Sequence, residues 1–268
     1  MMATANSWLI GLVLCAGAGL NLFAADTNQA TTSPARIEAD AAARARKAYL
    51  EIRDRFQADT NNVEVAWQYA RACYNVASSA TNNAERAKIA EEGIGVSRRL
   101  VARKPDLVQA HYYLGMNLGQ LADTKRNMAA LKIVDEMERE FEAARKLDER
   151  FEHAGADRNL GLLYSQAPSI ISIGSRSKAR QHLRRTVDLD PDFPENRLDL
   201  IEAYSKWGSR NDGLRELKAL EELWLEARKQ FAGDDWAADW VDWDRRLEAA
   251  RRKLGAPPKP VESPRHRD

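Results

Sequence analysis

The chain has 268 residues, 44% of them hydrophobic and 30% charged, which is enough apolar side chain for a continuous core and too much for a disordered chain. Forty-one basic side chains against forty acidic ones leave a formal net charge of +1. This balance favours neither a polyanion nor a membrane surface as a partner, and it argues against nucleic acid.

Residues 1–25 are typical of a secretory signal peptide. An apolar run from Trp8 to Phe23 precedes Ala24 and Ala25, near which we expect cleavage. The run is a poor membrane span, and membrane attachment would require this segment to be kept as an uncleaved anchor. Cys15 does not indicate a lipoprotein, because a bulky Leu stands where a lipobox needs a small residue. We therefore expect a periplasmic or secreted protein.

Three further segments follow in chain order. Residues 26–32 are a polar, Thr-rich spacer, and Ser33 followed by Pro34 marks the start of the first helix. Residues 33–255 are rich in Ala, Leu, Arg, Glu and Lys and lack strand-like alternation, which predicts one all-α domain. Residues 256–268 contain four prolines and predict a disordered tail. Once the signal is removed, Cys73 is the only cysteine, so it is expected to be a buried small side chain.

Similar helix pairs recur along the predicted domain. In each unit an apolar residue is followed by a small or close-packing position and then, one helical turn on, by a large side chain, and a second helix closes the unit. The markers are Leu114-Gly115 with Leu118, Leu160-Gly161 with Tyr164, Leu200 with Tyr204, and in a degenerate first unit Trp67, Ala70 and Tyr74. A small residue lets paired helices approach closely, and a terminal proline stops the second helix.

This pattern resembles the tetratricopeptide repeat, whose signature runs Trp, Leu-Gly, Tyr, then Ala, Phe, Ala and Pro. The spacing exceeds the usual 34 residues, being 46 from Leu114 to Leu160 and 40 from there to Leu200. We expect the insert Gln120 to Lys132 to lengthen the link within the second pair. The insert Gln166 to Ser177 is expected to fold against the array through its isoleucines, which are Ile170, Ile171 and Ile173.

Stretched repeats of this kind are similar to the tetratricopeptide component of bacterial tripartite ATP-independent periplasmic transporters, and to the related regulator-of-microtubule-dynamics family. The resemblance covers Val63 to Tyr204. It implies an α-solenoid of about four stretched helix pairs, a periplasmic location, and association with a solute-binding protein in solute transport. The sequence departs from the transporter component in lacking a lipobox and in having the single Gly174 where a Gly pair is expected.

Tryptophans dominate the last predicted helix. Trp236, Trp240 and Trp243 recur at helical spacing, and Trp224 lies on the preceding helix. A terminal helix must cover the exposed end of a solenoid, so we predict a Trp-rich capping helix. The alternative is an aromatic docking face for a partner.

No catalytic motif is found, and the histidines are not spaced as zinc ligands, so we predict a protein without catalysis, cofactor or metal site. His111 is expected to be a core or groove histidine that needs one hydrogen-bond partner. Paired carboxylates such as Asp235 and Asp239 are expected on solvated helix faces.

The first helix of each pair lines the concave side of a solenoid. The candidate binding residues on these helices are Gln68, Asn75, Tyr112, Met116, Gln120, Arg158, Leu162, Gln166, Glu202 and Lys206. This mixture favours an extended peptide or a protein edge, and it predicts a protein-interaction scaffold. The alternative is a periplasmic binding module that holds a small apolar ligand in the solenoid groove. Oligomeric state is not determined by these patterns.

Overall fold

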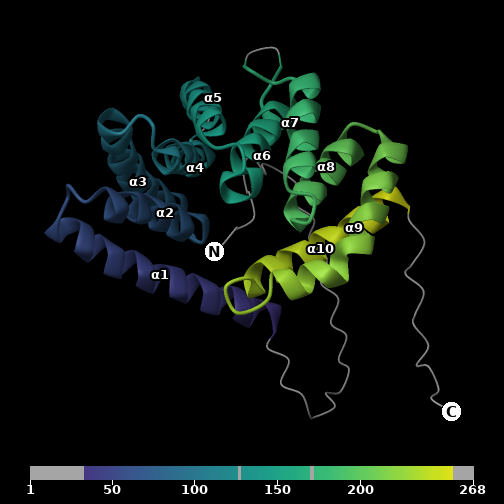
Figure 1. The fold of residues 1–268 in the computed structure, drawn as a ribbon, viewed down its shortest axis with the longest axis horizontal. Coiled ribbons are helices and arrows are strands. Elements are labelled where there is room, and N and C mark those ends of the chain that lie inside the picture. Colours follow the sequence, from purple (N-terminus) through teal and green to yellow (C-terminus); the bar gives the residue numbers. More distant parts are fainter. Residues whose placement is uncertain (1–32, 126–127, 170–171, 256–268) are drawn as a thin grey trace, which may run out of the picture.

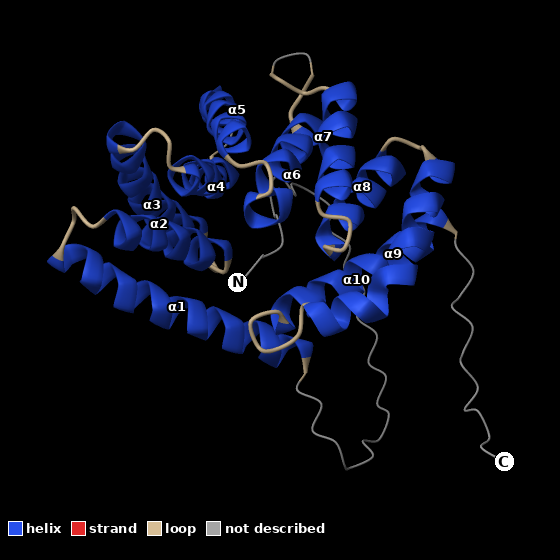
Figure 2. Cartoon of the chain, in the orientation of Figure 1, coloured by secondary structure: helices blue, strands red, loops and turns tan. Residues whose placement is uncertain are grey.

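The computed structural model describes residues 33–125, 128–169 and 172–255. Across these ranges the chain folds into ten helices and no strand (Figures 1 and 2). The helices are α1 (Pro34–Ala58), α2 (Val63–Ser78), α3 (Asn83–Arg103), α4 (Val108–Thr124), α5 (Met128–Leu147), α6 (Phe151–Gln166), α7 (Arg176–Leu189), α8 (Pro194–Lys206), α9 (Arg210–Gln230) and α10 (Ala237–Leu254). The predicted signal peptide, spacer and tail lie outside the described residues.

Four of the helix pairs are hairpins of consecutive helices: α2 with α3, α4 with α5, α6 with α7, and α8 with α9. In Figure 1 they follow one another along an arc, with α2, α4 and α6 on the inner side and α3, α5 and α7 on the outer side. Helix α1 precedes the array and α10 follows it. The predicted all-α, tetratricopeptide-like solenoid of four pairs with a final capping helix is therefore confirmed.

Local sequence sets where several helices begin. The side chain of Asn62 accepts a hydrogen bond from the Val65 amide, and the side chain of Asn82 does the same for the Glu85 amide. These caps satisfy amides that have no partner within the first turn of a helix. Pro34 and Pro194 stand in the first turns of α1 and α8, where the missing N–H removes no helical hydrogen bond.

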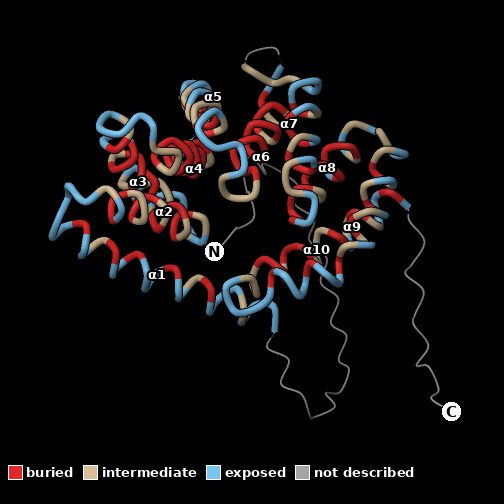
Figure 3. The backbone as a smooth tube through the Cα atoms, in the orientation of Figure 1, coloured by how far each residue is buried: buried red, intermediate tan, exposed pale blue. Residues whose placement is uncertain are grey.

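The glycines of the repeat signature allow close helix packing. A Cβ atom on Gly115 would lie 2.6 Å from the Phe141 ring, and one on Gly161 would lie 2.6 Å from Cγ of Leu183. Phe141 and Leu183 belong to the second helix of each pair. The Leu-Gly signature therefore marks the α4–α5 and α6–α7 contacts directly. Helix α4 is buried without interruption over residues 110–120, at the centre of the array (Figure 3).

The first insert differs from its prediction. Residues 120–132 do not form a lengthened link, because α4 continues to Thr124 and α5 starts at Met128. Ala122 is buried on the extension of α4, so the additional residues are used as helix. The α4–α5 repeat exceeds the usual 34 residues chiefly because its two helices are extended, and not because the loop between them is long.

The second insert is a loop between α6 and α7, as expected. Ile173 packs against the main core, and the Ser175 amide donates to the Tyr164 carbonyl at 2.9 Å. A Cβ atom on Gly174 would collide with the Ala167 carbonyl oxygen, so the loop backbone turns tightly against the end of α6. Ile170 and Ile171 lie outside the described residues.

The tryptophans of α9 and α10 are part of a core. Trp224, Trp240 and Trp243 are buried, and the Trp240 indole N–H donates to the Phe231 carbonyl at 2.7 Å. The alternative prediction of an aromatic docking face is therefore wrong for these rings, and the capping prediction is confirmed. Helix α10 also packs against α1, where the Arg44 guanidinium donates to the Asp234 carbonyl at 2.9 Å, so the two ends of the array meet (Figure 1).

Within the described ranges, no helix combines the length and the apolar character needed to cross a bilayer.

Candidate functional site: a charge cluster between α6, α8 and α10

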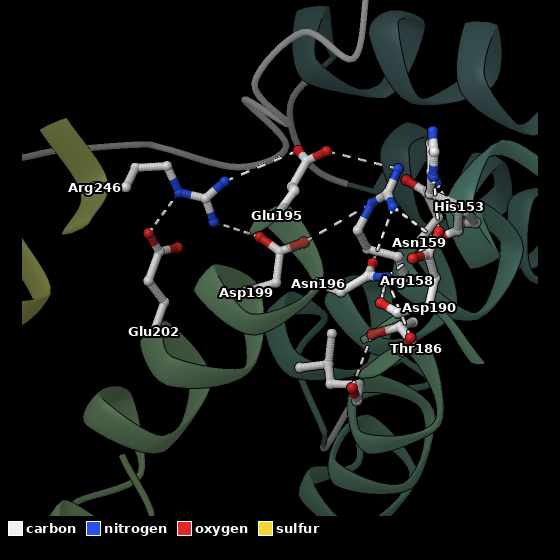
Figure 4. A network of polar contacts seen from close by, with 12 residues as sticks. His153, Arg158, Asn159, Thr186, Asp190, Glu195, Asn196, Asp199, Glu202 and Arg246 are labelled. Carbon is white, nitrogen blue, oxygen red and sulfur yellow. Dashed lines mark hydrogen bonds and ion pairs between the residues drawn. The ribbon is translucent and has the colours of Figure 1, made fainter. Parts of the chain in front are cut away.

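Charged side chains gather where α6, α8 and α10 approach one another (Figure 4). Arg158 comes from α6, Glu195 and Asp199 from α8, and Asp239 and Arg246 from α10. We call these five residues the charge cluster. Glu195, Asp199 and Asp239 are only 2%, 3% and 3% exposed, which is unusual for carboxylates.

Arg158 is held in a fixed position by neighbours on two helices. Its Nη1 donates to the His153 carbonyl and to Oδ1 of Asn196, both at 3.1 Å, and its guanidinium lies 5.4 Å from the centre of the Phe193 ring. The remaining nitrogens approach the two carboxylates of α8. Nη2 is 3.7 Å from Oε2 of Glu195, and Nε is 4.0 Å from Oδ2 of Asp199. Both gaps are longer than a hydrogen bond.

Arg246 approaches the same carboxylates from the opposite side. It pairs with Asp199 and with Oε1 of Glu202 at 2.7 Å, and it lies 3.9 Å from Oε1 of Glu195 and 3.7 Å from Oδ2 of Asp242. Glu195 and Asp199 therefore lie between two guanidinium groups. Figure 4 shows this order from Arg158 across α8 to Arg246.

Several polar atoms of the charge cluster remain unpaired. In the described part of the chain, Oε2 of Glu195, Oδ2 of Asp199, Oδ2 of Asp239 and Nε of Arg158 are buried without a hydrogen-bond partner. An unpaired buried polar atom costs about 1–3 kcal/mol, and more when it carries charge. Such a concentration of unpaired atoms distinguishes this place from the apolar packing around it.

Burial also changes the ionisation of these carboxyls. Desolvation raises the pKa of Asp239 to about 9, and the nearby negative charge of Glu195 raises it further in the same direction. Burial raises the pKa of Glu195 to about 7, although the positive charge of Arg158 opposes this shift. Burial also raises the pKa of Asp199 above its ordinary value. At neutral pH Asp239 therefore stays protonated, and the cluster carries less negative charge than its three carboxyl groups could supply.

A left-handed turn at the start of α6 supports Arg158. Glu152, His153 and Ala154 have φ angles of 50°, 59° and 59°, a conformation that costs a non-glycine residue about 1–2 kcal/mol. The Tyr113 hydroxyl donates to Glu152 at 2.7 Å, and Nδ1 of His153 lies 2.7 Å from Oδ2 of Asp190. These contacts hold the turn.

The same turn points the backbone carbonyl of His153 toward the charge cluster. The His153 ring stacks on Phe193 with the centroids 4.1 Å apart, and its backbone oxygen accepts from both Arg158 and Asn196. The His153 hydrogen bond lowers the pKa of Asp190. The strained backbone therefore fixes the position of the Arg158 guanidinium.

The predicted binding residues occupy three kinds of position. Tyr112, Met116, Gln120 and Arg158 are buried; Gln68, Asn75, Leu162 and Gln166 are half-buried; and Glu202 and Lys206 are exposed. Arg158 and Glu202 are brought into one network through Arg246 and Asp199. Lys206 donates to the Ser165 carbonyl at 2.9 Å, and Gln68 donates to Glu64 at 2.6 Å. Tyr112 packs among aromatic rings in the core, with Phe151 and Phe141 nearby.

The sequence also predicts the surroundings of His111 and Asp239. His111 is buried, with Nδ1 2.6 Å from Oε2 of Glu140 and Nε2 2.9 Å from the Pro105 carbonyl oxygen, so the expected core histidine is confirmed. Asp239 corrects the expectation of a solvated carboxylate, because α10 turns this side chain inward beside its buried tryptophans.

The sequence does not predict four residues of this site, which are Glu195, Asp199, Asp239 and Arg246. One signal could have found Asp199. A residue with a polar atom directly precedes each signature leucine: Tyr113, Asn159 and Asp199 stand before Leu114, Leu160 and Leu200. On α10, Asp239, Asp242 and Arg246 follow one another at spacings of three and four, which places them along one face of a helix.

A second feature is an apolar pocket between α4, α5 and α6. Its lining residues are Ala122, Asp123, Ala130, Val134, Met137, Asn159, Leu162, Leu163 and Gln166. Two of the predicted binding residues, Leu162 and Gln166, thus border one cavity. Within the described ranges, no three His, Cys, Asp or Glu side chains come together as a metal site.

Stacked helix pairs with glycine-mediated contacts and a terminal cap define a tetratricopeptide-like α-solenoid. Residues 35–154 match the family model "Regulator of microtubule dynamics protein 1-3". No match to a curated protein sequence was found.

Two solved structures share the fold. A thermophilic tetratricopeptide-repeat protein of Thermus thermophilus, TTC0263, is 19% identical, with a TM-score of 0.57 over 81% of this chain and 96% of that one. MamA is 18% identical, with a TM-score of 0.50 over 68% of this chain and 89% of that one. At such identities the likeness establishes the fold alone.

Proposed function

We propose that the chain is an exported, non-catalytic scaffold that binds a protein partner on the inner side of its helix array. The observation that carries this proposal is the charge cluster, whose unpaired buried polar atoms lie on α6, on α8 and on the capping helix. Tetratricopeptide-like solenoids offer an extended concave surface, and such a surface suits a peptide or a protein edge.

Export and a role in transport are finer parts of the same proposal. The apolar run from Trp8 to Phe23, followed by Ala24 and Ala25, supports cleavage of a signal peptide. The resemblance of the stretched repeats to the periplasmic transporter component supports a solute-binding protein as the partner.

The test is affinity purification of the tagged full chain from the cell that exports it, with the surface of α8 altered. Glu202 and Lys206 are exposed on α8 and stand four residues apart, so the double variant Glu202→Ala/Lys206→Ala changes this surface. The matched control is Lys218→Ala/Glu222→Ala, an exposed pair at the same spacing on α9. We expect one protein to be enriched by the wild type and the α9 control and lost with the α8 variant.

Equal recovery with both double variants would contradict binding at α8. Recovery of no enriched protein by the wild type would contradict the scaffold function itself.

A second candidate function follows from the apolar pocket between α4, α5 and α6, which suits a small apolar ligand. Native mass spectrometry of the protein purified without denaturation is the test. A constant additional mass, lost in a Leu162→Arg variant that still folds, is the expected result. A wild-type chain that carries no additional mass contradicts a tightly held ligand.

A further inference from the structure

The charge cluster contains more hydrogen-bond acceptors than the described chain satisfies. Arg158 and Arg246 supply the guanidinium groups, whereas Glu195, Asp199 and Asp239 each leave one carboxylate oxygen without a partner. Each of these three side chains is at least nine-tenths buried. Because a buried carboxylate needs hydrogen-bond partners to stay ionised, the cluster favours an additional hydrogen-bond donor from outside the described chain.

Arg158 does not complete the pairing of the α8 carboxylates. Nη2 of Arg158 stops 3.7 Å from Glu195, and Nε stops 4.0 Å from Asp199. Both gaps involve carboxylate oxygens that are unpaired, so each of these oxygens can still accept a hydrogen bond from a donor outside the described chain.

Charge identifies the kind of donor. Asp242 and Glu202 add two further carboxylates around Arg246, and Asp242 is shared with Arg245. Once Glu195 and Asp239 are ionised, the acidic groups outnumber the arginines, so an anion would be repelled and a neutral donor would leave the excess charge in place. A compact cation with several N–H donors fits both the charge and the acceptors, and a lysine ammonium carries three.

The cluster is open to solvent along one side. The Glu202 side chain is 45% exposed and the Arg246 side chain 14%, whereas the side chains of Glu195 and Asp199 beyond them are 2% and 3% exposed. A long side chain with an apolar stem and a charged end can pass such a rim and place its end among buried carboxylates. Glu202 would be the first group that it meets.

We propose that the charge cluster receives a lysine side chain of the protein partner, with the ammonium group bound among Glu195, Asp199 and Asp239. This inference rests on the proposed function, because it names the chemistry by which the scaffold recognises its partner. The partner segment is therefore basic where it contacts α8 and α10.

The experiment measures binding of a labelled, end-capped Lys-Ala-Ala repeat peptide to the full chain, with a Glu-Ala-Ala peptide of equal length as the opposite-charge probe. The test variant is Asp239→Asn, which keeps the size of the side chain and removes its ability to become an anion. The control variant is Glu222→Gln on α9, which removes one acidic group at a 67% exposed side chain. We expect saturable binding of the lysine peptide, about tenfold weaker in Asp239→Asn and unchanged in Glu222→Gln.

Three results would overturn the inference: no saturable binding of the lysine peptide, equal weakening in both variants, or binding of free spermidine but not of the peptide. The first would indicate water at the cluster, the second general attraction to surface charge, and the third a small polyamine site.

A partner captured by affinity purification and retained by Asp239→Asn would overturn this inference and leave the scaffold function intact.

A measurement on the unsubstituted protein keeps the test independent of how a variant folds. An ammonium group pairs with ionised carboxylates, so the affinity for the lysine peptide should rise as the pH goes from about 6 to about 9, where Glu195 and Asp239 ionise. An affinity that falls or stays constant over this range contradicts the inference. The charged groups that face these two carboxyls are Arg158 from α6, Asp199 and Glu202 from α8, and Asp242 and Arg246 from α10.

Discussion

At the scale of single residues, the unusual feature of this protein is the burial of charge without complete pairing. Asp157 shows the ordinary solution, because His182 and Arg185 both pair with its buried carboxylate. Asp239 has no such partner for Oδ2 among the described residues. Asp239 therefore destabilises the folded protein at neutral pH, and this kind of cost is common where a protein binds something else.

Asp239→Asn is expected to stabilise the fold at pH 7 by about 2 kcal/mol. The folded-state pKa of Asp239 is raised from 3.8 to about 9. Between these values the folded chain holds a proton that the unfolded chain has released, so stability falls as the pH rises through this window. Chemical denaturation at several pH values measures the effect. A variant that unfolds at lower denaturant than the wild type at pH 7 would contradict it.

His111 supplies a second test at this scale. Its hydrogen bond with Glu140 raises the pKa of the imidazole above 6.5, so the stability it contributes is present below 6.5 and is lost as the pH rises through the folded-state pKa. An NMR titration should show Glu140→Gln lowering this pKa. Glu136→Gln, one turn earlier on α5 and paired with Arg98, should leave the pKa unchanged.

At the scale of helices, the repeat signature predicts which helices pack together, because each of its positions requires either a small or a large side chain. Gly161 has to be small, since Leu183 of α7 packs directly on it, and Tyr204 fills space that a smaller side chain would leave empty. The extent of α4 and α5 could not be predicted in the same way. Periodicity does not distinguish an inserted loop from two extended helices when the inserted residues are themselves helix formers.

Gly161→Ala should destabilise the protein by about 1–3 kcal/mol, because the new methyl would meet the side chain and the backbone nitrogen of Leu183. Gly95→Ala is the matched control. Gly95 is also inside a helix, but the nearest atom to its added Cβ is the end of Arg99 at 3.8 Å. Helix propensity alone should make Gly95→Ala stabilising by up to about 1 kcal/mol. Thermal unfolding that shifts both variants in the same direction would contradict this assignment.

At the scale of the whole molecule, the array closes on itself. Contacts between α1 and α10 join segments from opposite ends of the described chain, and this closure gives the inner helices a boundary on the side away from α5 and α7 (Figure 1). The charge cluster could not be predicted for the same reason. Arg158 meets Asp199 because α6 packs against α8, and Arg246 meets it because α10 folds back onto α8. No local sequence pattern encodes these contacts.

Arg44→Ala should loosen this closure. The change removes the hydrogen bond to the Asp234 carbonyl, so hydrogen exchange should become severalfold faster at the start of α10 and remain unchanged in α4. Lys47→Ala is the control on the same helix, because Lys47 makes only a 3.8 Å ion pair with Glu51 on α1 itself. Equal exchange in Arg44→Ala and Lys47→Ala would show that the Arg44 contact does not hold α10.

The central claim is that the inner side of this solenoid, at the charge cluster, binds a protein. The most direct measurement places a photoreactive residue at Glu202, on the rim of the cluster, and compares it with the same residue at Leu225, which is 67% exposed on α9. After irradiation of cells that produce the full chain, we predict one defined protein adduct from position 202 and none from position 225. Adducts of the same protein from both positions, or from position 225 alone, would contradict the claim.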